Sequence, residues 1–267
     1  CSSDLITLKN GGFEDAKGDK FAGLGFQDAI GSGTYADRNV AASGKMSLRM
    51  QDATGNLRVS QKLQLRPYAC YRMSARVKTK GFQPAGEFKF LALGANGRTL
   101  TFHDAHPKAD QDWTEIEVVF NSLDSTEVNV YIGIWGGLKG SLWIDDWAIE
   151  ELGLVNVLRR AACPFTVKSA DGKTTFEEGK DFEPVKDPKL GVVPYAGEYA
   201  FNHPGAAIKL TAGSRIKDGD KLLVSWYHPV IVHGSQVAAS LSDPKVFEVL
   251  KDQAKRVNTL LHAKTWF

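Results

Sequence analysis

The most constraining feature of the sequence is a series of short segments, between Leu5 and Leu152, in which apolar and polar residues alternate. Clusters of Gly, Asn and Asp separate these segments and mark turns. Alternation with period two puts the apolar side chains on one face of a strand, so the pattern predicts strands buried on one side. We expect strands at residues 48–50, 58–65, 71–78, 87–93, 100–103, 114–120, 127–135 and 142–150. That number suits a jelly roll, in which two antiparallel sheets pack face to face.

The remainder of the chain changes character twice. Alternation continues over residues 155–232 between turn signals, and the clearest strand is expected at residues 221–227. After Asp243 and Pro244, apolar residues recur at spacings of three and four, which is the period of a helix. Asp243 is the expected N-cap and Pro244 the first helical residue. The apolar stripe consists of Phe247, Leu250, Ala254, Val257 and Leu261.

These changes divide the 267 residues into three parts. We expect a jelly-roll β-sandwich at residues 1–152, a second small β-sandwich of Ig-like or spacer type at 153–235, and a C-terminal α-helix at 236–267. The fold class is therefore all-β with one terminal helix. Because an apolar helical stripe has to be buried, this helix either folds back on the small sandwich or leads into a further domain, for which we expect a catalytic barrel.

Charge and composition argue against several classes of partner and chemistry. Lys and Arg number 33 against 31 Asp and Glu, and no basic run is long enough to hold a phosphate backbone. No apolar stretch approaches the roughly 18 to 20 residues that span a bilayer. The sequence also lacks a nucleophile elbow, a phosphate-binding glycine loop and a zinc-protease motif. We expect no nucleic-acid partner and no transmembrane segment.

The cysteines bear on cellular location. Cys1, Cys70 and Cys163 are too few and too scattered for a disulfide framework or a zinc site, and we expect Cys70 and Cys163 to be buried thiols. Cys1, followed by two serines, resembles the mature start of a bacterial lipoprotein, although a trimmed chain can begin at any residue. The expected location is extracellular, periplasmic or at the cell surface.

Four segments carry a resemblance to a known group. They are Asn-Gly-Gly-Phe-Glu-Asp at 10–15, Ser-Gly-Lys-Met-Ser-Leu-Arg at 43–49, the stretch 67–78, and Leu-Trp-Ile-Asp-Asp-Trp at 142–147. Their order and spacing resemble the galactose-binding-like jelly rolls of carbohydrate-binding modules, particularly families 4, 9, 16 and 22. The resemblance implies binding of a polysaccharide or oligosaccharide. Residues 154–160, 176–182, 216–220 and 242–247 are similar to the region that follows such modules in bacterial multidomain glycoside hydrolases.

The same resemblance implies a structural calcium ion. In that group the ion commonly lies where the first strand, the Ser-Gly loop and the last strand meet, which corresponds here to Glu14, the carbonyl of Lys45, and Asp146. Calcium binds several hard oxygens and accepts carboxylates and carbonyls together. The alternative is that Glu14 and Asp146 are ordinary turn acids.

The predicted strand at 127–135 offers a platform for a sugar. Its even-numbered residues are aliphatic and must face the core, which places Asn129, Tyr131 and Trp135 together on the other face. Flat aromatic rings stack on the apolar faces of sugars, and planar amides bond their hydroxyl groups. The alternative for Trp135 is an edge aromatic that covers the core.

Further candidates lie outside that strand. Arg72 and Arg76 alternate with apolar residues and are candidates for hydroxyl or uronate contacts, although a solvated sheet face is normally rich in Arg and Lys. His103 is a weaker candidate, as are the neighbouring Phe102 and the loop aromatics Phe26 and Tyr35. His228 and His233 are five residues apart and would point to opposite faces of a strand, which argues against a shared metal.

The sequence as a whole predicts non-catalytic glycan binding in a secreted glycan-degrading protein. Glycoside hydrolysis needs two carboxylates that face each other across a cleft, and the adjacent pairs at 145–146, 150–151 and 177–178 do not meet this need. We therefore expect that this chain is not itself an enzyme. Two alternatives remain: part of a glycoside hydrolase or polysaccharide lyase whose catalytic domain lies elsewhere, and a surface adhesion or scaffold protein without a sugar site.

Overall fold

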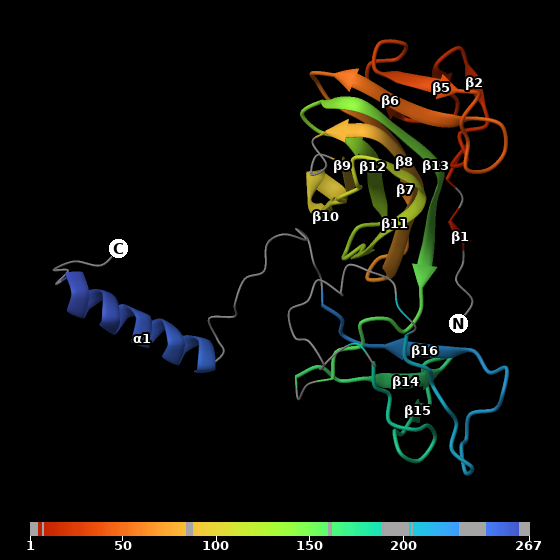
Figure 1. The fold of residues 1–267 in the computed structure, drawn as a ribbon. Coiled ribbons are helices and arrows are strands. Elements are labelled where there is room, and N and C mark those ends of the chain that lie inside the picture. Colours follow the sequence, from red (N-terminus) through yellow and green to blue (C-terminus); the bar gives the residue numbers. More distant parts are fainter. Residues whose placement is uncertain are drawn as a thin grey trace. The chain divides into compact units, whose positions relative to one another are not determined.

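The structure is a computed structural model, and it describes residues 5–6, 8–83, 88–159, 162–187, 189, 203, 205–229 and 244–261 (Figure 1). The chain divides into two compact units, residues 1–235 and 236–267. The calls that fall on Cys1, His233 and Asp243 lie outside the described residues.

Two antiparallel sheets form a sandwich from the N-terminal part of the chain (Figure 1). The larger sheet has the order β11 (Gln111–Asn121), β8 (Cys70–Gln83), β13 (Leu138–Leu152), β6 (Ser47–Ala53) and β5 (Thr34–Asp37), with β1 (Leu5–Ile6) paired to β13. The smaller sheet has the order β10 (Thr99–Asp104), β9 (Phe88–Leu93), β12 (Glu127–Ile134), β7 (Leu57–Gln64) and β4 (Phe26–Gln27). A separate ribbon pairs β2 (Ala16–Lys17) with β3 (Lys20–Phe21).

The predicted β-sandwich is confirmed, and every strand expected between residues 48 and 150 is present. The largest extensions are in two strands of the six-stranded sheet. β8 was expected at 71–78 and runs from Cys70 to Gln83, and β13 was expected at 142–150 and runs from Leu138 to Leu152. The strands β1 to β5 were not predicted. They are only two to four residues long, so they carry too little alternation to be recognised.

The inward side chains of both sheets form one hydrophobic core. The even-numbered residues of β12 and the odd-numbered residues of β8 contribute Val128, Val130, Ile132, Ile134, Tyr71, Met73, Ala75 and Val77, all of them buried. Fully burying one such aliphatic side chain stabilises the fold by roughly 1.5–3 kcal/mol. This burial fixes which face of each strand looks inward and leaves the outer faces of the two sheets to other roles.

The segment after Leu152 has its own small core. The sheet order is β15 (Thr175–Phe176), β14 (Thr166–Ser169) and β16 (Leu222–Ser225), and the strand expected at 221–227 is confirmed in shortened form as β16. Buried residues gather separately here: Leu154, Val157, Val167, Phe182, Val185 and Ile216. The separate core supports a division near residue 152, which stays a prediction.

The predicted terminal helix is confirmed as α1 (Pro244–Leu261). Within the described residues, Phe247, Leu250 and Val257 of its apolar stripe are exposed. None of the helices in the described part of the chain has the length and apolar character needed to traverse a bilayer.

Candidate functional site

The outer face of the five-stranded sheet carries a row of aromatic and apolar side chains. Strand register places Tyr131 between Ser60 of β7 and Leu91 of β9. Ser60 in turn pairs with Phe26 of β4, and Leu91 pairs with Phe102 of β10. Paired residues lie on the same side of a sheet, so these five side chains form one line across all five strands. With strands about 4.8 Å apart, the line is roughly 19 Å long.

Trp135 extends this line at the end of β12. Its ring meets Phe102 edge to face, with centroids 6.0 Å apart and planes at 87°. The guanidinium of Arg58 lies 5.8 Å from the centroid of Trp135 and 5.6 Å from that of Phe26. Phe26 is 43% exposed, and Tyr131, Phe102 and Trp135 are half-buried, so the rings present part of their surface to solvent.

A second, polar line runs beside the aromatic one. Arg58 of β7 pairs with Gly133 of β12, which pairs with Lys89 of β9, and Lys89 pairs with Asp104 of β10. Gly133 has a φ of 146°, and a Cβ there would lie 2.2 Å from the carbonyl oxygen of Leu57. Only glycine fits this position, and it leaves the sheet surface low between the two cations.

The three residues of the predicted platform on β12 lie on the outer side of the sheet, and their role in sugar binding stays a prediction. Asn129, Tyr131 and Trp135 are half-buried on the outer side, while the aliphatic residues between them are buried. Asn129 pairs with Lys62 of β7 and Leu93 of β9. The face also includes residues that the sequence did not single out, namely Arg58, Lys89 and Leu91. On β9 the half-buried residues Lys89, Leu91 and Leu93 alternate with the buried residues Phe88, Phe90 and Ala92. This alternation is the sequence signal that could have identified Lys89 and Leu91.

Arg72 and Arg76 do not join this platform. Both lie on β8, which belongs to the six-stranded sheet, so their outer face is on the other side of the sandwich. Arg72 forms ion pairs with Glu115, Glu117 and Glu150, the last at 2.9 Å. These three ion pairs occupy the guanidinium of Arg72, and no observation supports the predicted ligand role.

His103 also lies away from the platform. It is 8% exposed and pairs with Phe90, a core residue, and burial lowers the pKa of its imidazole. The register of β10 shifts between Thr99 and Thr101, which sends Thr101 and His103 inward and Phe102 outward. Phe102, grouped with His103 in the sequence, is the member of the pair that reaches the outer face.

The three segments of the expected calcium site do come together. The Glu14 carboxylate accepts hydrogen bonds from the Lys45 amide at 2.9 and 3.0 Å and from the Met46 amide at 3.2 Å. Asp146 Oδ1 accepts a bond from Ser43 Oγ at 2.6 Å. A carboxylate has about four lone-pair sites, so both acids retain capacity for a further partner, and calcium accepts carboxylate oxygens of this kind. The expected calcium site stays a prediction.

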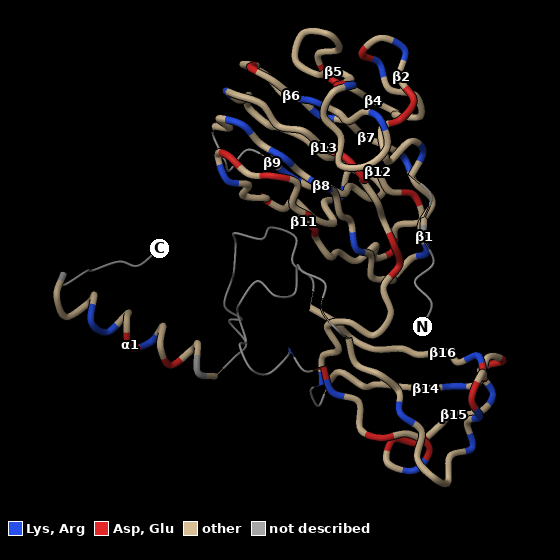
Figure 2. Tube along the Cα trace, turned by 45° about the vertical axis from the view of Figure 1, so that its right-hand side comes forward, with Lys and Arg blue, Asp and Glu red and all other residues tan. Residues whose placement is uncertain are grey.

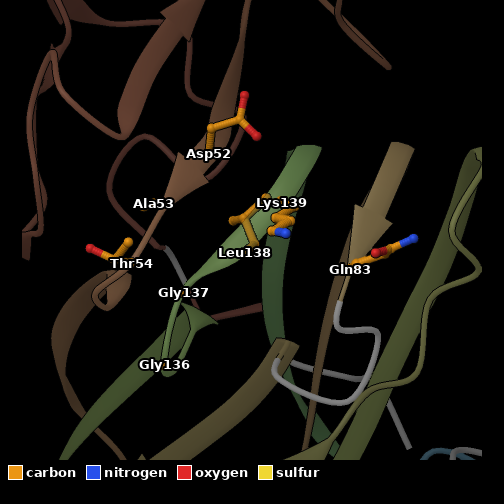
Figure 3. A pocket seen from close by; sticks show the side chains of 8 residues that line it. All are labelled: Asp52, Ala53, Thr54, Gln83, Gly136, Gly137, Leu138 and Lys139. Atoms are coloured by element: carbon orange, nitrogen blue, oxygen red, sulfur yellow. The ribbon is translucent and has the colours of Figure 1, made fainter.

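A shallow pocket of about 590 Å³ lies at one end of the sandwich (Figure 3). Its walls come from the ends of β6, β8 and β13 and the adjoining turns, and its lining residues are Asp52, Ala53, Thr54, Gln83, Gly136, Gly137, Leu138 and Lys139. No aromatic ring belongs to this lining, in contrast to the face of the five-stranded sheet.

Two observations on the described residues bear on catalytic chemistry. The thiol of Cys70 lies 3.5 Å from Nε2 of His228, but burial raises its pKa to about 12, so it stays protonated and unreactive at neutral pH. Cys70 is buried as expected, whereas Cys163 is only half-buried. The described part of the chain holds no cluster of three or more His, Cys, Asp or Glu residues arranged for a metal ion.

The chain was compared with family models, curated proteins and solved structures. No family model matches the chain, and no curated protein matches it. Solved structures similar to it include a cyclase from Fischerella sp. TAU, at 14% identity over 57% of this chain and 98% of that chain, with a TM-score of 0.47. They also include a family 16 carbohydrate-binding module, at 18% identity over 53% of this chain and 97% of that chain, with a TM-score of 0.39.

A family 61 carbohydrate-binding module in complex with β-1,4-galactotriose is similar at 17% identity over 55% of this chain and 99% of that chain, with a TM-score of 0.38. Sugar-binding modules and a cyclase thus both occur among the similar structures. Likeness at this level carries no argument about this chain, and function has to be argued from the side chains.

Proposed function

We propose that the outer face of the five-stranded sheet binds an oligosaccharide or polysaccharide chain without breaking any bond in it. The observation that carries this proposal is a line of side chains across all five strands that places the partly exposed rings of Phe26, Tyr131 and Phe102 on one face, with Trp135 beside it. Its length of roughly 19 Å spans several sugar rings, so the ligand is an oligomer rather than a monosaccharide.

Binding would combine stacking with hydrogen bonds. The rings of Tyr131 and Trp135 cover the apolar faces of the sugar units, and the amide of Asn129 and the charged groups of Arg58 and Lys89 bond hydroxyl groups. Arg58 also stabilises the arrangement of Phe26 and Trp135 by cation–π contact. A rigid sheet that holds these groups in place lowers the entropy cost of association.

The wider setting forms part of the same proposal. A module of this kind serves a secreted or surface-bound protein that acts on glycans, and the chemistry belongs to another domain of that protein. We also propose that calcium ties Glu14 and Asp146 together beside the Ser-Gly loop. The convergence of those two carboxylates on residues 43–46 supports it.

The proposal is tested with an affinity-gel and glycan-array panel of plant and algal polysaccharides on the whole chain. We expect at least one polysaccharide to bind, and Trp135→Ala to weaken that binding by about 30-fold or more, as a central aromatic anchor does.

The matched control is Tyr68→Ala, because Tyr68 is an aromatic residue that is 74% exposed and lies outside both sheets. Its affinity should stay at the wild-type value. Both variants should stay folded, with a modestly lower melting temperature for Trp135→Ala because it loses its contacts with Phe102 and Arg58. Equal affinity of Trp135→Ala and wild type would refute the platform, and an empty panel would refute glycan binding.

A further inference from the structure

Three cations on the candidate face each have a carboxylate partner among the described residues. Arg58 Nε lies 2.8 Å from Asp28 Oδ2, Lys89 contacts Asp104, and Lys62 Nζ lies 2.6 Å from Glu127 Oε1. The described part of this face therefore presents three cations and three carboxylates. Figure 2 shows the same mixture of signs along the strands of the sandwich.

The two cations nearest the aromatic line are also held by rings. Lys89 Nζ lies 5.1 Å from the ring centroid of Phe102, and the Arg58 guanidinium lies between Phe26 and Trp135. Lys89 is 11% exposed and Asp104 25%; Arg58 is 28% exposed and Asp28 18%. These pairs are thus largely withdrawn from water, where screening is weak and the partner's charge is strongly felt.

The free energy of binding a negatively charged ligand is unfavourable at this face. A uronate or sulfate group that approaches Arg58 or Lys89 also approaches the carboxylate bound to that cation, so attraction and repulsion largely cancel. The anion nevertheless loses its own hydration, which is costly without a net countercharge. Hydroxyl groups have no such difficulty, since they can donate to Asp28 or Asp104 and accept from Arg58 or Lys89.

We propose that this face selects uncharged glycans, and that Asp28 and Asp104 are the residues that exclude acidic ones. The inference rests on the proposed function and names the ligand class of the same site. A built-in repulsive element of this kind is a common source of specificity.

The test uses pairs of polysaccharides that share a backbone and differ in charge: hydroxyethyl cellulose with carboxymethyl cellulose, and a chemically desulfated carrageenan with the sulfated parent. Affinities are measured at one fixed ionic strength, together with the panel hit from the previous section and a charged derivative of it. The wild-type chain should prefer the uncharged member of each pair that it binds. Asp104→Asn removes the carboxylate that Lys89 contacts, so it should raise the ratio of affinity for the acidic member to affinity for the neutral member about tenfold.

The matched control is Asp124→Asn, which changes the net charge equally but removes an exposed partner of Arg98, with which Asp124 forms a 3.0 Å ion pair. Asp28→Asn is the second test variant in case Asp104→Asn does not fold. Preference of the wild type for the acidic member would overturn this inference and leave glycan binding intact. An equal gain in Asp104→Asn and Asp124→Asn would overturn it too, because the effect would then be one of total charge. Failure of the wild type to bind any member or any panel glycan would refute both proposals.

Discussion

The two outer faces of the sandwich use similar residues for different purposes. Both carry arginines beside carboxylates and aromatic rings. On the six-stranded sheet Arg72 is clasped by Glu115, Glu117 and Glu150, and Trp143 is 8% exposed with its indole N–H bonded to Asp37 at 2.9 Å. On the five-stranded sheet the rings of Phe26, Tyr131 and Phe102 share one partly exposed face. The cation on β8 is occupied by carboxylates, whereas the rings on the other sheet present surface to solvent.

The largest contrast is expected for Arg72→Ala. This change removes one cation and leaves three glutamates close together, so the free energy of unfolding should fall by about 3 kcal/mol. Because Arg72 faces away from the candidate site, glycan affinity of the folded protein should not change. Urea denaturation and a binding isotherm measured on the same sample check both halves. A loss of affinity without a loss of stability would break the distinction between the faces.

Removal of calcium should lower stability through the six-stranded sheet, to which both Asp146 and Arg72 belong. The proposed ion lies beside β13, so a chelator should lower the stability of the sandwich by about 2–3 kcal/mol if calcium had been near 100-fold above its dissociation constant. Calorimetry with and without chelator measures the shift, and added calcium should restore it. Glu14→Gln should abolish the response, and an unchanged transition in the wild type would count against the ion.

The smallest effect is expected for Trp143→Phe. Burial alone raises the pKa of Asp37, but the hydrogen bond from Trp143 and the charge of Arg49 outweigh it, so the pKa is lowered overall. A carboxylate with a lowered folded-state pKa stabilises the protein above its unfolded pKa and loses this effect as pH falls below about 4.

Trp143→Phe should therefore cost about 1 kcal/mol at neutral pH and weaken the acid dependence of stability. Melting temperatures of both proteins across the acidic range measure this. Parallel curves for wild type and variant would show that the bond to Asp37 does not set that dependence.

Much of the fold could be predicted from the sequence. In long alternating segments such as residues 127–135, the apolar positions show which face of the strand is buried. The shared face of Asn129, Tyr131 and Trp135 follows from the same period. Sheet membership could not be predicted, since it depends on pairing between distant strands. For that reason the sequence did not show that Arg72 and Arg76 lie on the other sheet from the platform residues.

Two local features also prevented part of the site from being predicted from the sequence. The register shift in β10 reverses the faces of Phe102 and His103, and no sequence pattern marks it. Phe26 stands on a strand of two residues, β4, which is recognisable only through its pairing with Ser60 of β7. Both positions are set by tertiary contacts rather than by local preference.

The most direct test of the account is to map the ligand's contacts by NMR, by titrating the isotope-labelled chain with an oligosaccharide taken from the best polysaccharide of the panel. The account predicts shifts of the Trp135 indole N–H and of backbone amides in β7, β9 and β12, with the Trp143 indole unmoved. Shifts confined to the Trp143 face, or to the pocket at residues 52–54 and 136–139, would contradict it.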